Sequence, residues 1–369
     1  MSAARYRVRL RQGRVVAIVA ERPGAVELEV EVDGERAKAL AFTELVGTAG
    51  EGDIVLLNTS AVALGLGTGG FHLVVSRADA PPTELQDGGR VMKARYTPLQ
   101  PVVSSVEETH REQIEGSPGL AETPVVCAPL HSMLAPIAAG ARAAGAERIV
   151  YVMTDGAALT GAFSRLVPVL REAGLLTGFV TTGQASGGEL EAVTIWTGLL
   201  AATEVAEADV VVVADGPGNL GTDTTWGVSA LGSGEALNAV EALGGRPVAA
   251  LRISFADHRA RHHGVSHHSL TILERVCSVR ANVVVPALEG PERALVWETL
   301  RGHKLEERHQ LVEADGQPAL RELERTGVEV ESMGRTPIDD PVFFLAAGAA
   351  GVVAGRMAER SRRWRTGQA

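Results

Sequence analysis

The sequence contains very little lysine: three of its 35 basic residues are lysines, and the other 32 are arginines. A phosphate clamp that depends on lysine is therefore scarcely available, and the P-loop pattern GxxxxGK[ST] does not occur. Cysteine is also scarce, since the 369 residues include only Cys127 and Cys277, each inside an apolar run and not paired at a metal-ligand or redox spacing. We interpret both cysteines as small buried hydrophobic residues.

The sequence has no excess of positive charge and no long apolar stretch. Its formal net charge of -10 argues against nucleic acid or an anionic membrane as a partner, but a small anionic ligand could still be bound by a local group of arginines. The N-terminal residues lack an apolar signal-like core, and the longest apolar run, 341–355, is shorter than the ~18–20 residues that span a bilayer. We therefore predict a soluble, cytoplasmic protein.

The order of residue patterns predicts an α/β protein with two domains. Residues 5–77 alternate between apolar and polar side chains in short runs, which predicts a small antiparallel β-barrel-like domain over 1–78. Residues 79–122 sustain no pattern and are interpreted as a connecting segment. Residues 123–369 alternate between short β runs and helix-length segments, and apolar runs such as VVVVA indicate strands covered on both faces. This predicts a Rossmann-like domain with a doubly wound, mostly parallel sheet.

The same patterns predict the elements of the second domain. Strands are expected at 124–128, 148–153, 176–181, 209–214, 247–253 and 282–286, with weaker candidates at 309–313 and 328–331. Helices are expected at 133–144, 163–173, 189–203, 234–243, 269–279 and 291–301. A closing helix over 340–360 carries small residues at Ala347, Gly348, Gly351 and Gly355. These residues suit close packing on the chain's own sheet or contact with a second copy in a homodimer.

Polar or glycine-rich sequence follows each of the first five strands of this domain. Because the carboxyl ends of parallel strands meet at one edge of a sheet, we expect these loops to converge there on a binding site. The residues predicted to contact a cofactor or ligand are Gly156, Gly183, Gln184, Gly187, Gly216, Gly218 and Thr222. The fourth loop also matches GxGxxG, but it does not open the domain and is therefore only a weak sign of a dinucleotide.

The fifth loop has the densest group of chemically active residues. The stretch 252–273, RISFADHRARHHGVSHHSLTIL, contains five of the ten histidines, and histidines spaced four apart would share one face if part of it is helical. Gly264 is expected to break the segment, so that the next helix begins with Ser266 as its N-cap. Neutral imidazole serves both metal ligation and general base catalysis near neutral pH. The residues predicted to be catalytic are His262, His267, His268 and Asp257.

A divalent metal is one of three interpretations of this group. Asp155 and Asp215, which follow the second strand and end the fourth, would join His267 and His268 in a set of oxygen and nitrogen ligands for Zn, Mn or Mg. Metal-free catalysis or anion binding, and a purely structural role, stay open because no metal signature such as HExxH occurs. The absence of GxSxG argues against a serine nucleophile.

Stretches along nearly the whole chain resemble one family of uncharacterised bacterial proteins, a domain of unknown function. They include LNTSAVALGLGTGGFH, MKARYTPLQ, CAPLHSMLAPIAAG, MTDGAAL, GQASGGELEAV, DGPGNLGT and RISFADHRARHHGVSHHSLT. The family has no established activity. The resemblance therefore implies that these loops belong together, and it does not choose a reaction.

Two functional hypotheses follow from these observations. The first is an enzyme that hydrolyses or transfers a group on a small phosphorylated or nucleotide-like ligand, with or without a divalent metal, at the carboxyl edge of the sheet. The second is a non-catalytic module that binds a metabolite or assembles as a homodimer.

Overall fold

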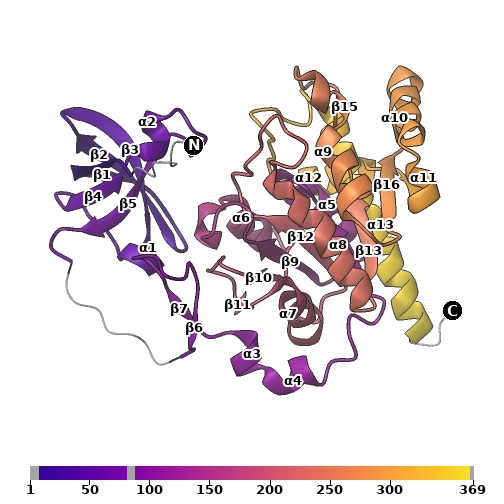
Figure 1. Cartoon of the computed structure of the whole chain (residues 1–369), viewed down its shortest axis with the longest axis horizontal. Coiled ribbons are helices and arrows are strands. Elements are labelled where there is room, and N and C mark those ends of the chain that lie inside the picture. The colour runs from indigo at the N-terminus through magenta and orange to yellow at the C-terminus, as the bar shows by residue number, and fades with distance from the viewer. Residues whose placement is uncertain (1–7, 81–87, 366–369) are drawn as a thin grey trace, which may run out of the picture. The chain divides into compact units, whose positions relative to one another are not determined.

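The computed structural model describes residues 8–80 and 88–365. The chain forms two compact units, Met1–Val103 and Ser104–Ala369, so the predicted connecting segment 79–122 is divided between them. The fold is mixed α/β: the first unit contains a closed five-stranded barrel, and the second contains an eight-stranded parallel sheet with helices (Figure 1). The predicted fold class is confirmed.

The barrel pairs its strands in the order β1-β2-β3-β5-β4, and β4 closes on β1. Its strands are β1 (Leu10–Arg22), β2 (Ala25–Val32), β3 (Glu35–Phe42), β4 (Ile54–Asn58) and β5 (Phe71–Arg77), and the short elements of this unit are α1 (Thr43–Val46), α2 (Ser60–Ala63), β6 (Val91–Met92) and β7 (Val102–Val103). Neighbouring strands are antiparallel except for β3 and β5, which run parallel.

Strand β1 is one long strand within the range whose alternation predicted short runs. It continues through Gly13 and pairs with β4 on one side and β2 on the other. A Cβ atom at Gly13 would lie 2.8 Å from Cδ1 of Leu57, so a larger residue would collide with the barrel core at this point. Residues 5–7, at the start of the alternating range 5–77, lie outside the described residues.

The second unit is built on a sheet with the order β11-β10-β9-β12-β8-β13-β16-β17, and all of its neighbouring strands are parallel. The strands are β8 (Pro124–Cys127), β9 (Ile149–Thr154), β10 (Gly178–Thr181), β11 (Leu190–Glu191), β12 (Val210–Asp215), β13 (Arg246–Ala250), β16 (Asn282–Pro286) and β17 (Gln310–Ala314). The strand predicted at 328–331 is wrong. Val328 and Val330 alternate because they pack against the core beside a helix, and not because they pair with a strand.

Alternate residues along each strand face two different apolar layers, which is why the strands are apolar throughout. Val210 and Val212 of β12 face the layer formed with α5 (Leu134–Ala143), α6 (Leu166–Glu172), α12 (Gln317–Thr326) and most of α13 (Pro341–Arg365). Val211 and Val213 face the layer formed with α7 (Ile195–Leu200), α8 (Gly232–Ala242), α9 (His267–Thr271) and α10 (Gly290–Gly302). The remaining short helices are α3 (Val106–Thr109), α4 (Arg111–Glu115) and α11 (Leu305–Arg308).

The long helix α13 packs on the chain's own helices. A Cβ atom at Gly351 would lie 2.0 Å from the carbonyl oxygen of Ile137 in α5, and one at Gly348 would lie 2.6 Å from Ala319 in α12. Gly348 and Gly351 therefore serve close packing within the chain, on two helices where the first of the two alternatives named the sheet. By length and composition Pro341–Arg360 could cross a membrane, but 78% of its apolar window is buried inside the protein, as in a core helix.

The connections that leave the neighbouring strands β8 and β12 run in opposite directions. From β8 the chain passes through α5, on one face of the sheet, to β9. From β12 it passes through α8, on the other face, to β13. In open α/β sheets a ligand binds outside the carboxyl ends of the strands at such a point, so the topology places the site beside β8 and β12.

Candidate functional site

A pocket of about 420 Å³ lies at this point of the sheet. Its walls come from the loop after β8, the glycine-rich loop after β12, the histidine stretch after β13 and the residues around 332. The polar residues that line it are His131, Ser132, Asn219, Thr222, Arg252, Arg259, Arg261, His262, His268 and Ser332. The volume falls in the range of roughly 300–1,000 Å³ that holds small molecules.

The histidine stretch folds as a hairpin that returns to the end of β13. Ile253 and Ser254 (β14) pair antiparallel with Gly264 and Val265 (β15). Gly264, at the start of β15, has a φ of 73°, a left-handed conformation that favours glycine. Ser266 then caps α9, because its side chain accepts a hydrogen bond from the backbone N–H of His268. The predicted N-cap is confirmed.

The condition for histidines four apart to share a helical face is not met in the loop of the hairpin. The hairpin loop has only a single 3-10 turn, Ala260–His262, so residues four apart do not share a face. His258 and His263 are exposed, and the ring of His263 packs edge-on against Phe255. The histidines that meet do so because the hairpin brings His262 back to the start of α9.

His262, His267 and His268 form a compact cluster, here called the histidine triad. One ligand nitrogen of each ring lies within 4.8 Å of those of the other two. The ring centroids of His267 and His268 are 3.9 Å apart. His262 donates or accepts at Nδ1 with Oγ of Ser266, at 2.8 Å. Three imidazoles in this arrangement could hold a metal ion.

The triad is neutral at neutral pH. Burial, aided by the positive charge of Arg252, lowers the pKa of His262 to about 3. Burial, with His267 as the next cause, lowers the pKa of His268 to about 4, and burial also lowers the pKa of His267. A neutral ring is the form that ligates a metal or accepts a proton.

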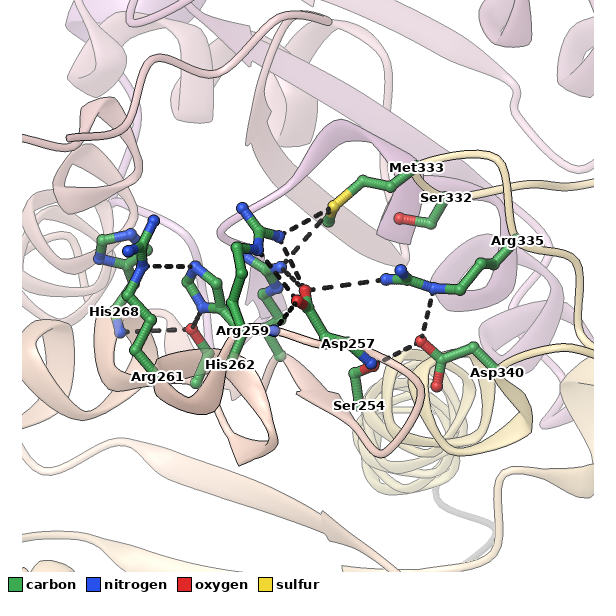
Figure 2. A network of polar contacts seen from close by, with 12 residues as sticks. Ser254, Asp257, Arg259, Arg261, His262, His268, Ser332, Met333, Arg335 and Asp340 are labelled. Carbon is green, nitrogen blue, oxygen red and sulfur yellow. Dashed lines mark hydrogen bonds and ion pairs between the residues drawn. The ribbon is translucent and has the colours of Figure 1, made fainter. Parts of the chain in front are cut away.

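A network of arginines and carboxylates lies beside the triad (Figure 2). Asp257, which is buried, accepts hydrogen bonds from Nη2 of Arg252 at 2.9 Å and from Nη2 of Arg259 at 2.7 Å. These contacts, above all those of Arg259, hold the pKa of Asp257 well below its usual value. Arg335 lies 3.8 Å from Asp257 and 3.3 Å from Asp340, so three guanidinium groups face two carboxylates.

Asp257, which we predicted to be catalytic, is bound to arginines and does not face the pocket. Both of its carboxylate oxygens are occupied by arginines, and it is not among the residues that line the pocket. Its contacts fix the side chains of Arg252 and Arg259, which do line the pocket.

Asp215 at the end of β12 anchors a second group of loops. Its Oδ1 accepts hydrogen bonds from Thr154 at 2.6 Å and from the backbone N–H of Gly156 at 3.2 Å. Its Oδ2 accepts one at 3.0 Å from the side chain of Asn219, which lines the pocket. Burial raises the pKa of Asp215 above its usual value.

The glycine-rich loop after β10 directs its amides to the protein's own carboxylates. The N–H of Gln184 donates to Asp155 at 2.8 Å, and the N–H of Gly187 donates to Glu191 at 2.7 Å. A Cβ atom at Gly183 would lie 2.2 Å from Oδ2 of Asp155, so the glycine is needed for the close approach. These amides stabilise the loops and are not directed at a ligand.

The structure thus divides the predicted residues into two groups. His262, His268, Gly218 and Thr222 line the pocket, and His267 completes the triad. The predicted residues that neither line it nor belong to the triad are Asp155, Gly156, Gly183, Gln184, Gly187, Asp215, Gly216 and Asp257. Within the described residues the aspartates do not join the histidine triad, so the predicted set of two aspartates and two histidines is not assembled.

The pocket arginines were not predicted from the sequence as a group. Arg252 follows directly after the buried strand β13 and its neighbour Leu251, and a charge in that position was the available signal. Ser332 and Met333 carried no signal, because they lie about 60 residues beyond the histidine stretch in a segment without a pattern.

Comparison with known proteins agrees with the resemblance seen in the sequence. A family model described as "Protein of unknown function (DUF3866)" matches residues 38–351. The chain belongs to this family. The matched range includes every residue that lines the pocket. No curated protein matched the chain. The family has no established activity, so membership in it does not assign a ligand or a reaction to the pocket.

Proposed function

We propose that the pocket binds a small phosphorylated or nucleotide-like ligand and that the protein is an enzyme that hydrolyses it or transfers a group on it. The observation that supports this proposal is that Arg252, Arg259 and Arg261 line the same pocket as two imidazoles of the triad. One guanidinium group can donate two parallel hydrogen bonds to two oxygens of a phosphate, and hydrogen bonds between charged groups are about twice as strong as those between neutral groups.

The charges of the pocket favour an anion. Arg252 is buried and uses Nη2 for Asp257, while its Nε has no hydrogen-bond partner among the described residues. Arg261 is paired with Asp223, whose side chain is 82% exposed, and a pair of this kind contributes little and can open. The pocket therefore has donors to offer to a ligand without the loss of a buried ion pair.

The reaction needs few parts beyond these. In hydrolysis, an oxygen of water forms a bond to phosphorus while the ester P–O bond breaks and its electron pair leaves with the departing oxygen, which takes up a proton. The arginines would stabilise the charge on the phosphoryl oxygens, and His262 and His268 would orient the water, whose proton passes through solvent to the departing oxygen. In this proposal the attacking water and the phosphate group occupy the same pocket.

The test combines binding and turnover. We expect inorganic phosphate and nucleoside monophosphates to raise the melting temperature, and acetate to have no effect. The variants Arg259→Gln and Arg261→Gln should each weaken phosphate binding by about 10–100-fold, the loss of one charge-assisted hydrogen bond. The matched control is Arg293→Gln, because Arg293 pairs with Glu313 and is not among the pocket residues.

The outcome also separates the two hypotheses. Turnover of phosphate esters that the Arg259→Gln variant loses supports the enzyme, whereas binding without turnover supports a non-catalytic metabolite-binding module. Equal binding by both pocket variants and the control contradicts an anion site in this pocket. A cytoplasmic location and a homodimer remain predictions, and if a dimer forms, its interface lies elsewhere than the glycines of α13, which pack on α5 and α12.

A further inference from the structure

We propose that His262, His267 and His268 bind one zinc ion whose fourth coordination position opens towards the pocket. This inference rests on the proposed function for the role of the ion, but not for its binding. Within the described residues, the triad is the group of three or more histidine, cysteine or acidic side chains whose ligand atoms lie close enough for one ion.

Two ring nitrogens of the triad lack the partners that buried polar atoms require. Nε2 of His267 and Nδ1 of His268 are buried and form no hydrogen bond with the described residues. More than about 90% of buried polar groups in proteins are paired, and an unpaired one costs roughly 1–3 kcal/mol. Two such atoms on adjacent rings indicate a partner that both rings share.

The surroundings of His262 are those of a metal ligand. Its Nδ1 is held by Oγ of Ser266 at 2.8 Å, and the same oxygen accepts the N–H of His268 at 3.3 Å. Hydrogen bonds of this kind to the second ring nitrogen fix the orientation of ligating histidines. The other nitrogen, Nε2, receives only a long contact of 3.4 Å from Arg261, a side chain that is partly exposed and can turn away.

The donor set selects the metal. Three imidazole nitrogens suit zinc and other late transition metals, whereas Mg²⁺ and Mn²⁺ prefer oxygen ligands, and the carboxylates of Asp155 and Asp215 are not part of the triad. Three protein ligands leave one position of a tetrahedral zinc ion open, as in catalytic sites. With zinc–nitrogen bonds of about 2.0–2.1 Å in a tetrahedral site, the distance between any two of the three ligand nitrogens is roughly 3.4 Å. The rings must therefore move slightly towards one another when the ion binds.

The neighbouring arginines favour an anion in the pocket, on the open side of the zinc ion. Arg252 and Arg261 would repel a bare cation, but an anion between the ion and the guanidinium groups compensates both charges. His262 and His268 line the pocket together with these arginines, so a phosphate oxygen can contact the metal while the others contact arginine. The zinc site therefore deepens the proposal for the pocket by giving the anion a second, metal-bound point of attachment.

The experiment is a zinc titration of the full chain freed of metal with a chelator, followed by elemental analysis after dialysis. We expect one zinc per chain. His267→Ala and His268→Ala should each weaken zinc binding by at least ~100-fold, and Ser266→Ala by about 10–100-fold, the effect of losing a partner of a ligating histidine. The matched controls are His258→Ala and His263→Ala, which remove exposed histidines of the same stretch.

The readouts keep the proposal testable whichever variant folds. Circular dichroism reports folding, and the cobalt-substituted wild type should show the intense visible absorption of four-coordinate nitrogen ligation. Wild type without stoichiometric zinc, or zinc affinity that falls in the controls and persists in the triad variants, overturns the inference. Phosphate binding measured in the presence of a chelator is independent of this result, so failure of the metal site and failure of the anion site are distinguished.

Discussion

Asn219 and Asp215 join the buried end of β12 to the wall of the pocket: Nδ2 of Asn219 donates to Oδ2 of Asp215 at 3.0 Å. The other carboxylate oxygen of Asp215 accepts hydrogen bonds from Thr154, the last residue of β9, and from Gly156 in the loop that follows. One buried carboxylate therefore connects the pocket to the neighbouring group of loops. Its role is to position the residues of the pocket wall, since it is not among the lining residues itself.

Replacing this carboxylate should weaken the pocket without abolishing the fold. In Asp215→Asn one of the two acceptor oxygens becomes an N–H₂ group, which cannot accept from Asn219 or from Thr154 and Gly156, so one of the two loops that Asp215 holds loses its anchor. We expect phosphate affinity to fall by about tenfold, the effect of roughly 1.4 kcal/mol lost in one hydrogen bond. Isothermal titration measures it. Asp155→Asn is the control, because Asp155 holds Gln184 away from the pocket and should leave the affinity unchanged.

The arginine network should fail when its central anion is removed. Asp257→Asn leaves the buried Arg252 without its carboxylate and also removes the partner of Arg259, whose side chain is 47% exposed. Breaking the buried Arg252–Asp257 pair in this way costs roughly 3–5 kcal/mol of unfolding free energy. Urea unfolding at pH 7 measures the difference. Glu322→Gln, which breaks a surface pair with Arg325, should cost at most about 1 kcal/mol. Similar losses in the two variants would contradict a special role for Asp257.

The pH dependence of this effect has a defined sign. Because the pKa of Asp257 is depressed in the folded protein, its contribution is complete above the unfolded value of about 3.9 and is lost as pH falls through the folded value. The gap between wild type and Asp257→Asn should therefore stay constant from pH 7 to about 5 and narrow only in stronger acid. A gap that narrows already between pH 7 and 6 would show that another group is responsible.

The sequence predicts the elements of the second unit better than the contacts between them. Apolar runs such as the one in β12 identify strands because every side chain of a strand that is buried on both faces lies in an apolar layer. Val328 and Val330 share this character but fill a layer beside a helix, and periodicity cannot distinguish the two uses over so short a segment. The two-residue strand β11 escaped prediction for a similar reason, since its two residues precede an apolar helix without a break in pattern.

The residue types of the site were predictable from the sequence. Which of these residues face the pocket and which contact other loops was not. Ser266 and Gly264 are local signals, a cap and a turn, and both occur as predicted. Asp155 was predicted as a metal ligand because it follows a strand, yet whether a strand-end carboxylate faces the pocket or a neighbouring amide depends on loop geometry. The contact of Asp257 with Arg335 joins segments about 80 residues apart, and sequence spacing has no information on such a pair.

The glycines of α13 provide a test of the core. In Gly351→Ala the added Cβ would lie 2.0 Å from the carbonyl oxygen of Ile137, so the helices must separate. We expect a loss of about 1–3 kcal/mol, as for other overpacked cores. Gly302→Ala is the matched control, because nothing lies within 4 Å of a Cβ at that position at the end of α10. It should be neutral or stabilise by up to ~1 kcal/mol through a less flexible unfolded chain. Thermal unfolding of the two variants decides whether the contact has this effect.

His131, which lines the pocket from the loop after β8, should make the protein sensitive to mild acid. Its ring is buried between Oγ of Ser164, 2.8 Å from Nε2, and the hydroxyl of Tyr151, 3.1 Å from Nδ1. Burial lowers the pKa of His131 from 6.5 to about 4. Between these two values the unfolded chain binds a proton that the folded protein does not, so stability falls as the pH decreases from 6.5 and the loss is complete below about 4.

The variant that isolates this effect is His131→Gln. A difference of about 2.5 pKa units corresponds to roughly 3 kcal/mol, so wild type should lose about that much more unfolding free energy than His131→Gln between pH 7 and 4. Only the change with pH is compared, because the substitution also alters packing at every pH. His258→Gln, at an exposed position, should follow the wild-type curve. Parallel curves for wild type and His131→Gln would mean that the ring is protonated in the folded protein, and that the contacts with Ser164 and Tyr151 rearrange to allow it.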